Sequence, residues 1–232
     1  MLPDFIGPAD SYDVKVEGSF SDLMNSRLDR LRITGRNVLF LRKYPVDELL
    51  LEMKNIRFDM EARTLKSAES TSLSAVMYES SLLRYVAREH PDLGQAHIVI
   101  SEGFVVATAE PELAHLSAQV EAVGKLRIRD GVRVDFVVEK VSVGGLPMPA
   151  AVANTIENQF NPVLNLSDCP LPITLTSIKM APGKVALTGT ADLTHGLPAG
   201  FSLTVKKPRA PVRLHAAIAV KGRHTQTFQH PT

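Results

Sequence analysis

Apolar and polar residues alternate in short segments through most of this chain. From Val132 to Val138, for example, every second residue is apolar. A period of two places one apolar row on one face of a pleated strand and the remaining residues on the other face. The pattern predicts several antiparallel strands whose apolar face must be covered by a second sheet, by helices or by a bound lipid.

The strand predictions follow the alternating segments and the turn signals between them. Within residues 46–60 the apolar positions change from odd to even, which implies a bulge or turn near Lys54 and Asn55. The dipeptide Asp130-Gly131 lies between two alternating segments and predicts a two-residue hairpin. The expected strands cover residues 12–20, 28–40, 46–60, 73–77, 96–100, 103–108, 116–122, 125–129, 132–138, 173–177 and 184–189.

Two segments have helical rather than alternating spacing. The first runs from Glu79 to His90 and is stopped by Pro91, and the second follows Pro149 and ends before Pro162. Each helix has an apolar stripe formed by residues three or four positions apart. The stripes consist of Leu82, Leu83 and Val86 on the first helix and Val152, Ile156 and Phe160 on the second.

The charge of the chain is unevenly distributed although its formal net value is only +1. Residues 194–232 contain six Lys or Arg and no Asp or Glu. This segment is either a solvated basic tail or a contact for anionic lipid head groups, through Lys206, Lys207 and Arg209. We expect one α+β domain over residues 1–193, followed by a basic extension that adds up to two strands, at 201–205 and 212–220, to the same domain.

No catalytic, metal-binding or cofactor-binding pattern is found in the sequence. The Gly-x-Ser-x-Gly elbow and the phosphate-binding glycine loop are both absent, and the seven histidines lack the short spacing of metal sites. The single cysteine, Cys169, excludes an internal disulfide. We therefore predict a protein that is not an enzyme, with no cofactor, no metal and no nucleic-acid partner; a lipid hydrolase is a distant alternative.

The sequence also lacks a visible membrane span or signal peptide. No stretch reaches the roughly 18 consecutive apolar residues that a membrane-spanning helix needs. Met1–Ala9 lacks the basic start and the apolar run of a signal peptide. Whether a targeting segment precedes this chain stays open.

The apolar stripes of the two helices allow two interpretations. They form a packed core, or they line an elongated cavity for acyl chains together with Val134, Phe136 and Val138, which share one strand face if no bulge intervenes. Burial of a sixteen-carbon chain would contribute about 12 kcal/mol, at about 0.8 kcal/mol for each CH₂ group. The sequence alone leaves both interpretations open.

From Tyr12 to Leu193 the chain resembles the LmeA-like phospholipid-binding family of bacterial envelope proteins. The order and spacing of four segments carry this resemblance: residues 18–35, 79–86, 145–164 and 172–189. Two features depart from the family pattern. Tyr78 stands where the family often has a Ser or Thr helix cap, and the basic segment after Leu193 has no counterpart.

The resemblance implies a tubular lipid-binding-like fold, in which a long, strongly curved antiparallel sheet wraps around the two amphipathic helices. It also implies a periplasmic or cell-envelope protein that binds or transfers phospholipids, supports envelope lipid metabolism and contacts the membrane peripherally. The alternative is a structural or scaffolding envelope module with a fully packed core and no lipid cavity.

Overall fold

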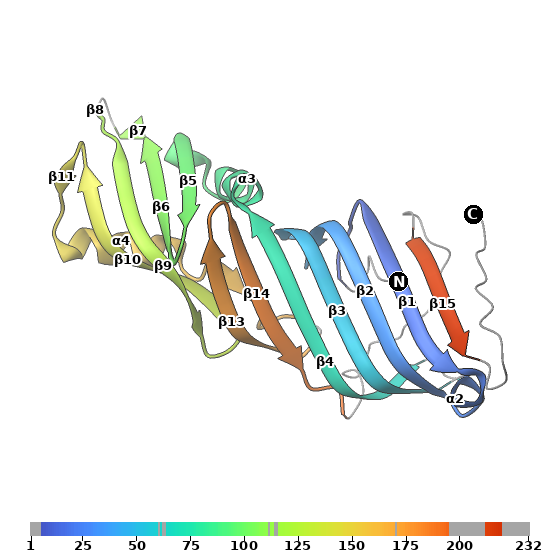
Figure 1. Cartoon of the computed structure of the whole chain (residues 1–232). Helices are drawn as coiled ribbons and strands as arrows, with labels where there is room; N and C mark the ends of the chain where they lie inside the picture. Colours follow the sequence, from blue (N-terminus) through green and yellow to red (C-terminus); the bar gives the residue numbers. More distant parts are fainter. Residues whose placement is uncertain are drawn as a thin grey trace. The chain divides into compact units, whose positions relative to one another are not determined.

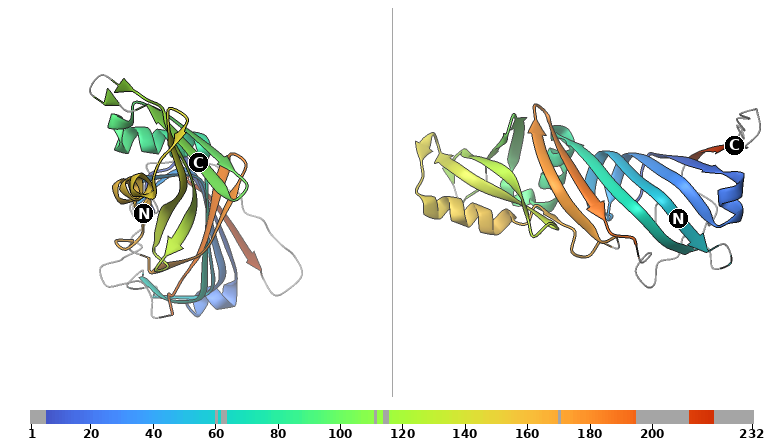
Figure 2. Two further views of the ribbon diagram at one scale, coloured as in Figure 1. Left: turned by 90° about the vertical axis from the view of Figure 1, so that its left-hand side faces the viewer. Right: turned by 60° about the horizontal axis from the view of Figure 1, so that its bottom comes forward.

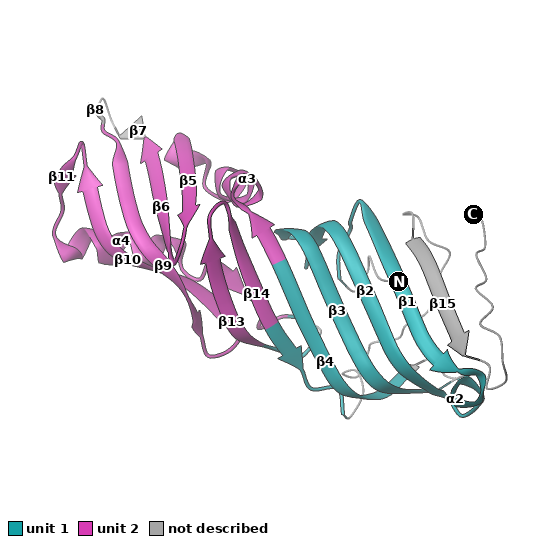
Figure 3. Ribbon diagram, in the orientation of Figure 1, with its two compact units in different colours: residues 1–75, 169–174, 189–232 teal, residues 76–168, 175–188 magenta. Residues whose placement is uncertain are grey.

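The chain forms two compact units in the computed structural model (Figure 3). The structure describes residues 6–59, 61, 64–110, 112–113, 116–169, 171–194 and 212–219. Unit 1 contains residues 1–75, 169–174 and 189–232, and unit 2 contains residues 76–168 and 175–188. We describe each unit by itself.

Unit 1 is built on long antiparallel strands (Figure 1). A short helix, α2 (Phe20–Met24), connects the first two of them. The strands of its sheet are β1 (Ser11–Ser19), β2 (Arg27–Phe40), β3 (Tyr44–Asp59), β4 (Thr64–Tyr78) and β15 (Val212–Ala219), together with β13 (Ile173–Ala181) and β14 (Lys184–Ala191), most of whose residues belong to unit 2. They form a seven-stranded sheet in the order β13-β14-β4-β3-β2-β1-β15, in which β15 runs parallel to β1. Strands β4, β13 and β14 have residues in both units.

The core of unit 1 follows the alternation, with one change of phase in β3. Leu49, Leu51 and Met53 are buried at odd positions, and Ile56 is buried at an even position. Asn55 has a φ of 49°, in the left-handed region, and β3 continues through it. The irregularity expected near Lys54 and Asn55 is therefore present, and it moves the apolar side chains to the buried face without ending the strand.

Tyr12 anchors the first strand in this core. Its hydroxyl donates a hydrogen bond of 2.8 Å to the carbonyl oxygen of Gly7, and burial raises the pKa of the phenol above its usual value. The ring lies against Gly35, where an added Cβ would lie 2.9 Å from Tyr12 Cε1 and 2.5 Å from Val38 Cγ2. Gly35 therefore provides the space that the aromatic ring fills.

Unit 2 combines an antiparallel sheet with two helices. The helices are α3 (Glu79–Glu89), followed by the 3-10 turn η1 (Pro91–Leu93), and α4 (Ala150–Phe160). Strands β5 (Gln95–Ser101), β6 (Phe104–Glu110), β9 (Val120–Arg129), β10 (Arg133–Val143) and β11 (Leu146–Pro147) lie in the order β11-β10-β9-β6-β5, and β12 (Leu164–Asn165) also pairs with β10. Strands β7 (Glu112–Leu113) and β8 (Leu116–Ser117) form a separate two-stranded sheet.

The mostly-β α+β class and both predicted helices are confirmed, and the strand at 212–220 is found as β15. The predicted strand at 201–205 lies outside the described residues. The single long, strongly curved sheet is not found among the described residues, because the strands divide between a seven-stranded and a six-stranded sheet. Alternation shows which face of a strand is buried but not which strand it pairs with, so the division was not visible in the sequence.

Helix α2 was not predicted. Residues 12–20 were expected to be one strand, but the strand ends at Ser19 and the chain then turns into the helix. Ser19 caps the helix, since its Oγ accepts a hydrogen bond of 3.1 Å from the backbone N–H of Asp22. Ser19-x-x-Asp22 is a capping-box sequence, so the signal was present in the chain.

None of the helices in the described part of the chain has the length and apolar character needed to cross a bilayer.

Candidate functional site

One face of the unit 2 sheet is apolar across four neighbouring strands. Residues that are directly paired across strands share a face. In one row Ile98 pairs with Ala107, Ala107 with Ala122 and Ala122 with Val141. The next row contains Ile100, Val105, Gly124 and Val138, and Leu126 and Phe136 continue the face beyond it.

The opposite face of this sheet is rich in charged residues. Lys125 on β9 and Glu139 on β10 form an ion pair with a distance of 2.7 Å between Nζ and Oε1. The buried carboxylate of Asp135 lies 2.6 Å from Nε of Arg129. The contrast between the two faces shows which one the helices must cover.

Both helices lie on the same side of the unit 2 strands, as Figure 2 shows, and their side chains pack on the apolar face. Helix α4 packs mainly on β10 and helix α3 on β5, so the helices occupy opposite ends of the strand order. Half-buried side chains of both helices contact a cluster of buried sheet residues. The buried members are Ile98, Ile100, Val105, Ala122, Phe136 and Val185.

The structure brings together six of the predicted lipid-binding residues in this cluster. Phe136 is buried in it, and the half-buried side chains packed against it include Leu82, Leu83, Val86, Val138 and Ile156. Val134, Phe136 and Val138 do share one face, because the register shift in β10 falls after Val138.

Three predicted residues are not part of the cluster as described. Val134 is fully buried and pairs with Ile128, one row beyond Phe136. Val152 and Phe160 are half-buried on α4. The predicted head-group residues Lys206, Lys207 and Arg209 lie outside the described residues.

Side chains at the end of α4 hold this helix against the outer edge of β10. Oδ1 of Asn161 accepts a hydrogen bond of 2.7 Å from the backbone N–H of Phe136, and Nδ2 of Asn161 donates one of 2.9 Å to the carbonyl oxygen of the same residue. Oε1 of Glu157 accepts a hydrogen bond of 2.7 Å from the backbone N–H of Val138. The amide of Asn161 thereby takes the place of a neighbouring strand.

Backbone groups on either side of α4 occupy the rest of that edge. Leu166 and Val163 donate to the carbonyl oxygens of Val132 and Val134, and Met148 donates to that of Val141, each at 2.9 Å. Strands β11 and β12 pair with the two ends of β10. The edge of β10 is thus bonded at positions along its whole length.

Helix α3 is held at the other end of the sheet and meets α4 at the C-terminal ends of both helices. Oε2 of Glu79 accepts a hydrogen bond of 2.8 Å from the backbone N–H of Ile100 on β5. The ring of His90, which caps α3, packs edge-on against the ring of Phe160, with 4.7 Å between the ring centroids. None of Glu79, His90, Glu157 and Asn161 was singled out from the sequence, since edge contacts of this kind follow no linear pattern.

The central strands of the sheet carry small side chains between the two helices. Ala107 on β6 and Ala122 and Gly124 on β9 lie on the apolar face, between Ile98 and Ile100 on one side and Val138 on the other. The apolar stripes of the two helices flank this central strip and are only half-buried. This part of the sheet face presents mainly hydrocarbon surface.

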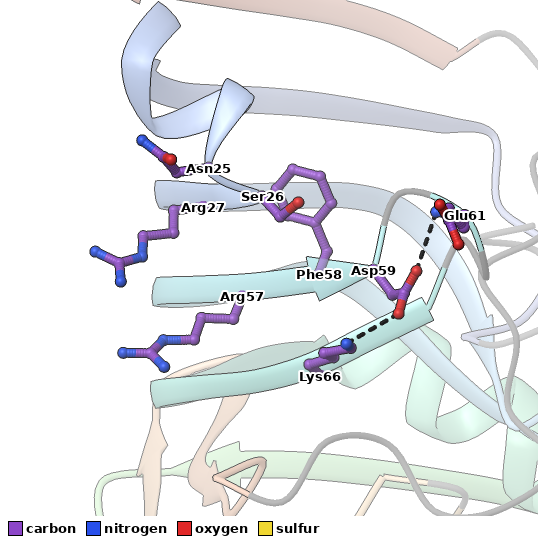
Figure 4. A pocket seen from close by; sticks show the side chains of 8 residues that line it. All are labelled: Asn25, Ser26, Arg27, Arg57, Phe58, Asp59, Glu61 and Lys66. Carbon is purple, nitrogen blue, oxygen red and sulfur yellow. Dashed lines mark hydrogen bonds and ion pairs between the residues drawn. The ribbon is translucent and has the colours of Figure 1, made fainter.

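A separate hollow lies on unit 1 and is polar (Figure 4). It is open, has a volume of about 450 Å³ and lies next to the end of α2. Its lining consists of Asn25, Ser26, Arg27, Arg57, Phe58, Asp59, Glu61 and Lys66. Within it, Nζ of Lys66 and Oδ2 of Asp59 are 2.9 Å apart.

The reactive groups of the described residues do not assemble into a metal or thiol centre. No group of three or more His, Cys, Asp or Glu residues that could hold a metal ion occurs in the described ranges. Burial raises the pKa of the Cys169 thiol, which disfavours the nucleophilic thiolate.

Of three comparisons with known proteins, one found a match, and it agrees with the apolar character of the unit 2 site. No curated protein and no solved structure matches the chain. A family model described as LmeA-like phospholipid-binding matches residues 6–190, which include all of unit 2 and most of the described part of unit 1. The chain therefore belongs to the LmeA-like phospholipid-binding family.

Proposed function

We propose that the protein binds phospholipids by holding their acyl chains on the apolar face of the unit 2 sheet, in an elongated cavity between α3 and α4. One observation carries this proposal: two amphipathic helices lie on the same sheet face, on either side of central strands that carry Ala and Gly, and their apolar stripes are only half-buried. Family membership supports phospholipid as the ligand.

The chemistry of the site suits binding without reaction. Acyl chains need a dry apolar surface rather than precisely placed polar groups. Each CH₂ that leaves water contributes about 0.8 kcal/mol, so one long chain supplies ample binding free energy. The protein then acts as a non-enzymatic carrier that transfers phospholipids and supports envelope lipid metabolism.

The finer points of fold and location belong to the same proposal. The two helices on one sheet face support a tubular lipid-binding-like architecture for unit 2. A carrier of phospholipids that belongs to this family would work at the outer side of the cytoplasmic membrane, as a periplasmic or cell-envelope protein in peripheral contact with a bilayer.

Native mass spectrometry of the purified full chain tests the proposal directly. We expect phospholipid to be bound to the protein as purified, or to be taken up from labelled vesicles. Protein that is repeatedly free of lipid and takes up none would instead favour a scaffolding module with a packed core.

The substitution Ile156→Trp tests where the lipid lies. The larger side chain would occupy space on the apolar face, and exclusion of two CH₂ groups lowers affinity for lipid by about tenfold. Val99→Trp is the matched control, because Val99 lies on the opposite face of the same sheet and is 51% exposed. Uptake of fluorescent phospholipid measures both variants.

Thermal unfolding of Ile156→Trp separates a hollow site from a filled one. In a packed core the added volume costs about 1–3 kcal/mol and lowers the melting temperature by several degrees. A melting temperature close to that of the wild type, together with reduced lipid uptake, supports a hollow site. A large fall with unchanged uptake places the lipid elsewhere.

A further inference from the structure

Helix α2 presents exposed apolar side chains at one end of the unit 1 sheet. Phe20 is 59% exposed and Met24 is 70% exposed. Because they are four residues apart on a helix, they lie on the same side of it. The capping hydrogen bond between Ser19 and Asp22 stabilises the first turn of the helix that carries both side chains.

Two arginines lie beside this helix in an unusual arrangement. Arg27 on β2 and Arg57 on β3 are direct cross-strand partners, so two like charges face each other. Such a pair is unfavourable unless an anion lies between or above the two charges. Figure 4 shows both side chains pointing to the same side of the sheet, away from Asp59 and Lys66.

Three other basic residues nearby have ion-pair partners, in contrast to this pair. Arg32 on β2 donates to Glu52 with 2.8 Å between Nη2 and Oε2, and Arg30 lies 3.5 Å from Glu17 and 3.9 Å from Glu52. Lys66 pairs with Asp59. Among the residues that the structure describes, Arg27 and Arg57 have no hydrogen-bond or ion-pair partner for their guanidinium groups.

We propose that this end of unit 1, the α2 tip formed by Phe20, Met24, Arg27 and Arg57, docks onto the surface of a bilayer that contains anionic phospholipids. The two guanidinium groups bind lipid phosphate, for which their planar donor geometry is suited. Phe20 and Met24 enter the boundary between head groups and acyl chains, where short amphipathic helices rest. The open hollow lined by both arginines gives a head group access to them.

The combination of features favours a bilayer over other partners. Cationic groups beside exposed apolar side chains match an interface that is anionic on its outside and apolar a few ångströms deeper. A free phosphate would use the arginines but not Phe20 or Met24. The docking site deepens the peripheral bilayer contact of the proposed function. It uses only unit 1 residues and needs no lipid inside the protein, so the vesicle tests can fail while the lipid-uptake test succeeds.

Sedimentation of the full chain with vesicles tests the role of the arginines. We expect binding to phosphatidylcholine vesicles that contain phosphatidylglycerol and weak binding to vesicles of phosphatidylcholine alone. Arg27→Gln with Arg57→Gln should lower affinity for the anionic vesicles by about twenty-five-fold, from about fivefold for each cation near the surface. Wild-type binding should weaken as salt is raised.

Arg36→Gln is the matched control for the arginine variants. Arg36 is exposed on the same strand, nine residues from Arg27, which corresponds to about 30 Å along a strand. It should leave vesicle affinity unchanged. The proposal is overturned if the double arginine variant binds the anionic vesicles as tightly as the wild type does. It is also overturned if Arg36→Gln loses as much vesicle affinity as the double variant.

Phe20→Ser with Met24→Ser tests the apolar contribution. We expect a fall in vesicle affinity on the order of tenfold, while the salt dependence of binding is retained. Val99→Ser removes an exposed apolar side chain in unit 2 and should have no effect. All four side chains of the tip are exposed, so unchanged thermal unfolding should accompany each loss.

Inorganic phosphate distinguishes a bilayer site from a site for the free anion. Under our proposal, phosphate at constant ionic strength competes poorly, because it lacks the apolar contact. Two results together would overturn the bilayer assignment in favour of a free-phosphate site. Phosphate would displace the protein fully from vesicles, and Phe20→Ser with Met24→Ser would leave vesicle affinity unchanged.

Discussion

Gly124→Ala should lower the free energy of unfolding by about 3 kcal/mol, the upper end of the usual cost of overpacking. An added Cβ would lie 2.2 Å from the backbone oxygen of Val137 and 2.8 Å from Cε2 of Phe136. Neither neighbour can move freely, since Val137 is in a sheet strand and the Phe136 ring is buried. Urea unfolding followed by circular dichroism measures the change.

Gly18→Ala provides the control for this substitution. Gly18 also lies in a strand, but its added Cβ would meet no atom closer than 3.6 Å, and that atom belongs to the side chain of Leu28. We expect a change of no more than about 1 kcal/mol, in the direction of stabilisation, because alanine restricts the unfolded chain. Equal stability of the two variants would show that the Phe136 ring does not lie over Gly124.

Asn161→Ala should lower the free energy of unfolding by about 2–4 kcal/mol. The substitution leaves both the N–H and the carbonyl oxygen of Phe136 without their partners, and each unsatisfied group costs about 1–3 kcal/mol when it is removed from water. Both groups are only partly buried, so the total loss of unfolding free energy is smaller than the sum of two fully buried groups would be. Urea unfolding gives the total, and hydrogen exchange should show faster exchange of the Phe136 amide.

Two further variants make this prediction specific. Asn158→Ala changes the same residue type at an exposed position of the same helix and should alter stability by no more than about 0.5 kcal/mol. Asn161→Asp keeps the acceptor for the Phe136 N–H but loses the donor, so its stability should lie between those of the wild type and the alanine variant. A loss in Asn158→Ala as large as in Asn161→Ala would contradict the edge contact.

Residues whose role depends on local periodicity were predicted well from the sequence. The alternation of Val134, Phe136 and Val138 placed them on one face, and the structure agrees. The change of phase in β3 was visible because Ile56 breaks the odd-numbered series, and Asn55 accounts for it with its left-handed backbone. Local sterics and burial decide these features, so neighbouring residues contain the information.

Features that depend on distant partners were not predicted. Asn161 is one polar residue after a helix in the sequence, and only the fold brings it to the edge of β10, 25 positions earlier in the chain. Arg27 and Arg57 become neighbours only through the register of β2 and β3. Helix α2 is a different case, since its capping box was readable but its five residues are too few for a helical period to appear.

The apolar face of unit 2 shows that function, too, was only partly predictable from the sequence. An apolar helix stripe has one sequence pattern whether it faces packed side chains or a lipid chain. In the structure Leu82, Leu83, Val86 and Ile156 are half-buried on one sheet face, which fits both arrangements. The family match supplies the ligand class, and the lipid-uptake and melting experiments together distinguish an open site from a filled one.

The occupied outer edge of β10 also bears on self-association. Free N–H and C=O groups along an exposed strand invite an extended segment of another molecule to add to the sheet, which is a route to aggregation. Here α4 and its flanking segments already form hydrogen bonds with those groups. A strand from another molecule would have to displace these intramolecular hydrogen bonds. A protein with a broad apolar sheet can in this way avoid polymerising from that side, even when it is concentrated.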